Sequence, residues 1–92
     1  MSDKYQKKLT SLPNIGENLA NELRKVGIYS TKRLIELGSV EATLKITRGR
    51  PSTGYNLLYA LEGAIRDVRW HSLQRTDLLR LRSEYDAKRL SI

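Results

Sequence analysis

The chain has 92 residues, a formal net charge of +7, one histidine and no cysteine. The lack of cysteine excludes disulfide frameworks, thiol catalysis and cysteine-based zinc sites, and one histidine leaves no histidine-rich metal site. No apolar run approaches the roughly 20 residues of a membrane span, and no apolar stretch follows the basic N-terminus as in a signal peptide. We therefore expect one cytoplasmic domain over residues 1–92, with no cofactor, metal or small-molecule substrate and no enzymatic activity.

Leucines at helical spacing recur through the first half of the chain, and a helix-breaking or capping residue follows each run. The pattern predicts four short helices: one that ends at Leu12, one around Leu19 and Leu23, one through Leu34 and Leu37, and one that carries Val40 and Leu44. The residues expected to end or cap these helices are Pro13, Gly27, Ser30, Thr31, Gly38 and Ser39.

The second half of the chain predicts a loop at residues 47–52 and then two longer helices. The helix over about 52–68 should be the central core helix, because its apolar residues fall on one face. That predicted stripe consists of Leu57, Leu61, Ile65 and Val68, with Leu58 and Ala64 filling it. Gly63 inside this helix costs about 1 kcal/mol against alanine, so we expect a neighbouring helix to cross closely there. The whole pattern predicts an all-α fold of five to six short helices, with a core over about 8–72 and a final amphipathic helix over about 76–90.

The segment Leu12-Pro13-Asn14-Ile15-Gly16 resembles the turn of a helix-hairpin-helix motif, which usually reads Leu-Pro-Gly-hydrophobic-Gly. Such a turn directs backbone N–H groups at the start of its second helix toward a DNA phosphate, without reading the base sequence. Asn14 replaces the first glycine. Asparagine tolerates the left-handed backbone, but its side chain is expected to crowd an approaching phosphate. The resemblance implies a helix-hairpin-helix, or SAM-like, bundle.

An offset of 25 residues indicates a second hairpin at Leu37–Glu41. Leu9, Leu12, Ile15 and Leu19 then correspond to Leu34, Leu37, Val40 and Leu44. Glu41 takes the place of Gly16, so a carboxylate would stand where a phosphate has to bind. If the repeat is real, the second hairpin is structural; the alternative is a chance match among common leucines.

Longer segments resemble the C-terminal domain of the TfoX/Sxy competence-regulator family over roughly residues 8–80. The matching segments are Leu12–Gly16, Val26–Ile28, Leu37–Ala42 and Asn56–Ala64, followed by Trp70. The resemblance implies an all-helical domain, a link to transcriptional control of DNA uptake in bacteria, and no enzymatic activity. Full-length regulators of this family carry a further N-terminal domain, so we expect this chain to be a stand-alone version.

The leading functional hypothesis is a non-enzymatic regulatory module that binds a protein partner, a second copy of itself included. The predicted surface is an apolar face of the last helix or of the core helix. Leu78, Leu81 and Tyr85 share one face of the last helix and are the predicted contact residues. The alternative for this helix is that the same face packs on its own domain.

The second hypothesis is a sequence-independent DNA-binding domain. Its predicted site is the backbone of Asn14, Ile15 and Gly16, with Lys8, Arg48 and Arg50 as phosphate contacts. Structural roles are predicted for six further residues: core packing for Trp70, Tyr55 and Tyr59, a local hydrogen bond or solvent for His71, and an ion pair between Glu62 and Arg66.

Overall fold

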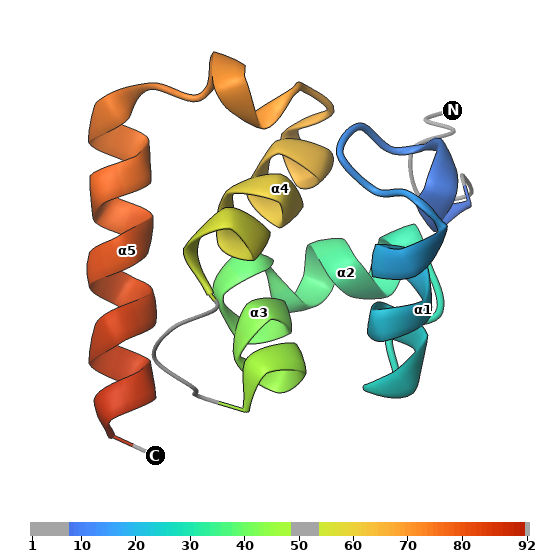
Figure 1. Ribbon diagram of the computed structural model, residues 1–92, viewed down its shortest axis with the longest axis horizontal. Coiled ribbons are helices and arrows are strands. Elements are labelled where there is room, and N and C mark those ends of the chain that lie inside the picture. The colour runs from blue at the N-terminus through green and yellow to red at the C-terminus, as the bar shows by residue number, and fades with distance from the viewer. Residues whose placement is uncertain (1–7, 49–53, 92) are drawn as a thin grey trace.

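A computed structural model describes residues 8–48 and 54–91, and every regular element in these two ranges is a helix (Figure 1). The elements are the 3₁₀ helix η2 (Leu9–Ser11), α1 (Glu17–Lys25), α2 (Thr31–Leu37), α3 (Ser39–Thr47), α4 (Tyr55–Arg66), the 3₁₀ helix η3 (Trp70–Ser72) and α5 (Arg75–Leu90). The predicted all-α fold is confirmed. None of the described helices is both long and apolar enough to cross a membrane.

The helix boundaries follow local chemistry at most of the predicted positions. Ser30 caps α2, because its side-chain oxygen accepts a hydrogen bond from the Arg33 backbone N–H at 3.1 Å. Gly27 follows α1 with a φ of 86°, a conformation that glycine adopts without strain. The prediction that Ser39 caps the next helix is wrong. Ser39 is the first residue of α3, and its hydroxyl instead donates to the Glu62 carboxylate at 2.6 Å.

The beginning of the chain and the predicted 47–52 loop are described only in part. Of the first predicted helix, the described residues contain the single 3₁₀ turn η2, which ends just before Leu12. Thr47 still belongs to α3, and Arg48 ends that helix in a left-handed conformation. Most of the predicted loop lies outside the described residues.

Helix α4 lies at the centre of the molecule, as predicted, and its buried face is centred on Leu61 and the two residues predicted to fill the stripe (Figure 1). Leu58, Leu61 and Ala64 are fully buried, whereas the side chains of Leu57 and Ile65 are only partly buried. Val68 lies beyond the end of α4 and is exposed. The core contains two clusters, and α4 contributes to both of them.

Helix α5 packs against α3 and α4 along one side of the molecule (Figure 1). Its central anchor is Tyr85, which is fully buried and shares a hydrogen bond of 2.8 Å with the Thr47 hydroxyl. Gly54 makes room for this ring, because a side chain at Gly54 would overlap the Tyr85 phenol. Tyr55 donates a hydrogen bond to Asp86, and this carboxylate raises the pKa of the Tyr55 hydroxyl.

Candidate functional site

The predicted hairpin is the turn between η2 and α1, and two buried side chains hold it in place. Leu12 and Ile15 belong to the core, and the Ile15 backbone N–H donates to the Leu12 carbonyl at 3.4 Å. Asn14 between them has a φ of 68°, a conformation that asparagine tolerates better than most residues. Asparagine therefore serves where the usual hairpin has a glycine.

The side chain of Asn14 is turned into the domain, where it joins the hairpin to the end of α4. Its amide nitrogen donates to the carbonyls of Ala60 at 3.3 Å and Val68 at 3.0 Å. Its amide oxygen accepts from the Trp70 backbone N–H at 3.3 Å. The expectation that this side chain crowds an approaching phosphate is therefore wrong, because three hydrogen bonds hold it on the inner side of the turn.

Gly63 is required by this same contact. A side chain at Gly63 would place its first carbon 2.5 Å from the Asn14 amide nitrogen and 2.7 Å from the Val68 carbonyl oxygen. The prediction of a close approach at Gly63 is confirmed, but its predicted cause is wrong. The hairpin side chain and the loop after α4 approach Gly63, rather than a neighbouring helix.

The outer side of the hairpin carries the uncapped start of α1. The first backbone N–H groups of a helix have no acceptor within the helix, and Gly16 at the N-cap position has no side chain to supply one. Gly16 has an extended backbone, with φ −93° and ψ −174°, and an added side chain there would meet nothing within 4 Å. Neither backbone conformation nor packing within the domain requires a glycine at this position.

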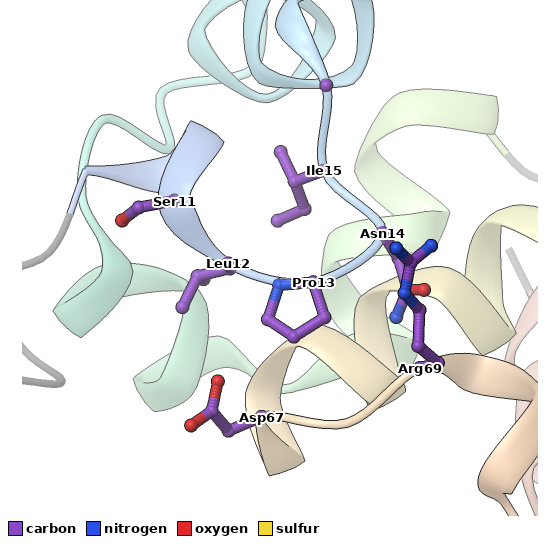
Figure 2. Close-up of a pocket in the computed structure, with 8 residues that line it drawn as sticks. Ser11, Leu12, Pro13, Asn14, Ile15, Asp67 and Arg69 are labelled. Atoms are coloured by element: carbon purple, nitrogen blue, oxygen red, sulfur yellow. The ribbon is translucent and has the colours of Figure 1, made fainter.

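An open pocket of about 490 Å³ lies against the hairpin, lined by residues 11–16 together with Asp67 and Arg69. These two side chains come from the loop after α4 and approach the turn from the same region of the fold (Figure 2). The Arg69 guanidinium is exposed and can pair with an anion. The carboxylate of Asp67, and that of Glu17 at the first position of α1, oppose such an anion. The pocket can hold one phosphate through backbone donors and a single cation, with its attraction reduced by two acidic neighbours.

The structure does not gather the predicted phosphate contacts around this pocket. Lys8 is exposed and immediately precedes η2. Arg48 is also exposed, but it follows the last residue of α3, at the lower side of the view in Figure 1 and away from the hairpin. Arg50 lies outside the described residues. Arg69, which does line the pocket, was missed because it is distant from the hairpin in the sequence and only the fold brings the two together.

The second predicted hairpin, between α2 and α3, differs from the first in its backbone. An offset of 25 from Glu17 would start its second helix at Ala42, but α3 begins three residues earlier, at Ser39. Glu41 pairs with Lys88 of α5 at 2.6 Å, and this contact raises the pKa of Lys88. The second hairpin therefore connects two parts of the fold through Glu41.

The residues predicted to bind a protein partner face the interior. Leu81 and Tyr85 are 4% and 0% exposed, and Leu78 is partly buried against the same cluster. The expectation that they form an exposed surface is therefore wrong, and the alternative that this face packs on its own domain is confirmed. The large apolar side chains that α5 does expose are Leu79 and Leu90.

The remaining residues singled out from the sequence have structural contacts. Trp70 is half-buried and stacks on the buried Tyr59, with ring centroids 5.9 Å apart. His71 is exposed. The predicted ion pair between Glu62 and Arg66 is confirmed at 2.6 Å. Within residues 8–48 and 54–91, no three histidine, aspartate or glutamate side chains gather to hold a metal ion.

Known proteins resemble this chain in both sequence and fold. The family model of the TfoX C-terminal domain matches residues 5–85. A triclinic crystal structure of an uncharacterized protein from Listeria monocytogenes is 38% identical, with a TM-score of 0.80 over 88% of this chain and 92% of that chain. A tetragonal crystal structure of a Listeria monocytogenes protein of unknown function is also 38% identical, with a TM-score of 0.76 over 85% of this chain and 96% of that chain. No curated protein matches the chain. Because the family model spans most of its length, the chain belongs to the TfoX C-terminal domain family.

Proposed function

We propose that this domain is a non-enzymatic binding module whose hairpin holds the phosphate backbone of a nucleic acid. The observation that carries the proposal is the open edge at Gly16, where the uncapped start of α1 borders the pocket that Arg69 also lines. Backbone N–H groups and the helix dipole favour an anion at such an edge. A phosphate held in this way carries no base information, so binding is expected to be independent of sequence.

Two further features support a close approach of phosphate. The Asn14 side chain is occupied on the inner side of the turn and leaves the outer side clear. Arg69 lines the same pocket and would add a charge-assisted hydrogen bond to the backbone donors. A nucleic-acid ligand also agrees with the link to transcriptional control that the family resemblance implies.

The acidic neighbours set the expected strength of this binding. Glu17 and Asp67 lie close to the proposed site and repel a phosphate, so one hairpin is expected to bind weakly at physiological salt. The net charge of +7 should strengthen binding at low salt. We therefore expect micromolar affinity at low salt and a steep loss as salt rises, because each neutralised phosphate releases a condensed counterion.

The test measures fluorescence anisotropy of a labelled random-sequence duplex with the full chain, at low and at near-physiological salt. Gly16→Asp should reduce affinity about tenfold or more, because an N-cap carboxylate takes up the helix donors and repels phosphate. The same change should leave the domain folded and raise its free energy of unfolding by a few tenths of a kcal/mol, since aspartate is a slightly better cap than glycine. Loss of DNA binding with gain of stability separates a binding role from a structural one.

Arg69→Glu and Lys45→Glu are a matched pair of charge-reversing substitutions that tests the position of the site. Both invert one exposed basic side chain, but only Arg69 lines the hairpin pocket. Arg69→Glu should weaken binding far more than Lys45→Glu, and Arg48→Glu should resemble Lys45→Glu. Equal losses from all three variants, or no binding at low salt, would reject the hairpin as the site.

A protein partner is the second candidate function. The surface first expected for it is buried, so this candidate now depends on the exposed side of α5, where Leu79 and Leu90 face solvent.

A further inference from the structure

Among the described residues, nothing packs on the side of α5 that points away from the domain. Helix α5 packs on α3 and α4 and forms one edge of the molecule (Figure 1). Leu79 and Leu90 are 50% and 74% exposed on the opposite side. We call the exposed row on that side the outer seam: Thr76, Leu79, Ser83, Ala87 and Leu90. No element in the described part of the chain covers it.

The spacing of the outer seam is that of a helix-packing surface. Its members are three or four residues apart, so they form one line along the helix. The leucines lie toward the two ends, and the small side chains of Ser83 and Ala87 lie between them. Small residues allow another helix to come close, while leucines supply the apolar contact area.

A second α5 placed antiparallel along this seam matches it residue by residue. With the two-fold axis at Ser83, each residue faces the one that lies equally far on the other side of Ser83. Leu79 then faces the partner's Ala87, and Leu90 faces the partner's Thr76. Every large side chain on one helix meets a small one on the other, which is the requirement for close packing.

The charges beside the outer seam select the same arrangement. Arg80 and Glu84 lie on one flank, and Arg82 and Asp86 lie on the other. In an antiparallel pair each flank meets its own copy, so Arg80 comes within about 3 Å along the axis of the partner's Glu84. The two Glu84 carboxylates come equally close along the axis, so this flank forms two attractive contacts and one repulsive contact per dimer. On the other flank Tyr55 already holds both charged groups: it donates to Asp86, and the Arg82 guanidinium lies 4.4 Å from its ring.

A parallel pair would join unlike flanks, so Arg80 and Glu84 would face the flank whose charged groups Tyr55 holds. The contacts of Arg80 with the partner's Glu84 would then be lost. The free charges therefore favour the antiparallel arrangement. Arg80 and Glu84 are about half exposed and remain accessible to a second copy, although within one chain Arg80 also lies 3.7 Å from Glu84 and 3.2 Å from Asp77.

We infer that the outer seam of α5 is a docking surface for a second copy of this chain, in a two-fold antiparallel pair centred on Ser83. The seam of this 16-residue helix is about 24 Å long and about 10 Å wide. That area is well below the roughly 800 Å² per partner of a stable complex, so the dimer is expected to be weak and dependent on concentration. This inference is separate from the proposed DNA site, because the hairpin residues take no part in it.

The test uses the absence of cysteine from the sequence. Ser83→Cys introduces one thiol at the two-fold axis, where it should face its own copy and form a disulfide-linked dimer under mild oxidation. Ala87→Cys is the matched control on the same exposed seam. Two copies of position 87 lie about 12 Å apart along the axis, which exceeds the reach of a disulfide. We expect Ser83→Cys to cross-link at least about tenfold faster.

A second set of variants tests the contacts themselves, with Ser83→Cys as background. Leu79→Lys should remove the rate advantage, whereas Tyr29→Lys, which changes an exposed tyrosine outside α5, should not. Arg80→Glu should slow cross-linking, and adding Glu84→Arg should restore it. Circular dichroism of each variant checks that it is folded.

Sedimentation equilibrium of the unmodified chain between 20 µM and 1 mM completes the test. It should show a monomer that shifts toward dimer with concentration. Equal cross-linking at positions 83 and 87, failure of the charge swap to restore it, or a strict monomer at 1 mM would each overturn the inference. Loss of DNA binding in the Gly16→Asp variant would leave it untouched.

Discussion

At the scale of single residues, Asn14 determines how the hairpin sits on the domain. Its backbone adopts the left-handed conformation of the turn, and its side chain makes three hydrogen bonds to the end of α4 and the following loop. Gly63 completes the contact by leaving room for the amide. The Asn14 side chain therefore holds the hairpin against the domain and leaves the outer edge of the hairpin open.

Asn14→Gly should lower the free energy of unfolding by about 2 kcal/mol. Glycine keeps the positive φ without strain, so the loss comes from three hydrogen bonds at about 0.5–1.5 kcal/mol each, offset in part where water replaces them. Gly63→Ala should also destabilise the domain, because its new carbon would overlap the Asn14 amide. Urea unfolding of both single variants and the double variant checks this.

The two changes should be less than additive, because the double variant no longer has an Asn14 amide to overlap. Part of the Gly63→Ala cost must persist, since the Val68 carbonyl still lies 2.7 Å from the new carbon. Strict additivity would contradict the coupling between these two positions.

Residue roles that depend on neighbours in the sequence could be predicted, and those that depend on the fold could not. The cap at Ser30 and the pair of Glu62 with Arg66 lie within one helical turn and were found from spacing. The inward turn of Asn14 and the approach of Arg69 both join the hairpin to the loop after α4. No local pattern signals such a contact, because its partners are far apart in the chain.

At the scale of elements, the docking of α5 decides which of its faces is exposed. Leucine spacing correctly predicted an amphipathic helix over about 76–90, and the helix spans Arg75–Leu90. Spacing alone identifies an apolar face but does not say what covers it. The hydrogen bond of Tyr85 to Thr47 shows that α3 and α4 cover the Leu81 and Tyr85 face. The surface available to a partner is therefore the opposite one.

Gly54→Ala should weaken this docking, because the added carbon would overlap the Tyr85 ring. Overpacking of a core typically costs about 1–3 kcal/mol. Gly16→Ala is a matched control, since Gly16 and Gly54 both hold N-cap positions and Gly16 has open space around it. Thermal unfolding should show a clearly larger loss for Gly54→Ala. A similar loss of thermal stability in both variants would mean that the loss comes from the N-cap position and not from overlap with the Tyr85 ring.

At the scale of the whole molecule, ion pairs hold both ends of α5 to the rest of the fold. Near its start, Asp77 pairs with Arg66 of α4 at 3.1 Å. Near its end, Lys88 pairs with Glu41 of α3 at 2.6 Å. The Arg66 guanidinium, followed by that of Arg80, lowers the pKa of Asp77, and the Glu41 carboxylate raises the pKa of Lys88. Acid, which protonates Asp77, should therefore weaken the ion pair near the start of α5. Alkali, which deprotonates Lys88, should weaken the ion pair near its end.

The last prediction concerns the contribution of the Asp77 ion pair to stability in acid. A carboxylate with a lowered pKa in the folded state stabilises the fold above its unfolded pKa of about 3.9, and this contribution is lost as pH falls through the folded value. Asp77→Asn should therefore destabilise the domain at neutral pH, and its difference from the unmodified chain should shrink below about pH 4 and vanish in stronger acid. Urea unfolding from pH 7 to pH 2 measures this difference.

Asp67→Asn is the control. Asp67 is exposed and has no ion pair among the described residues, and asparagine tolerates its φ of 63°. A difference for Asp77→Asn that stayed constant down to pH 2 would show that the lost contact is not the ionised pair with Arg66.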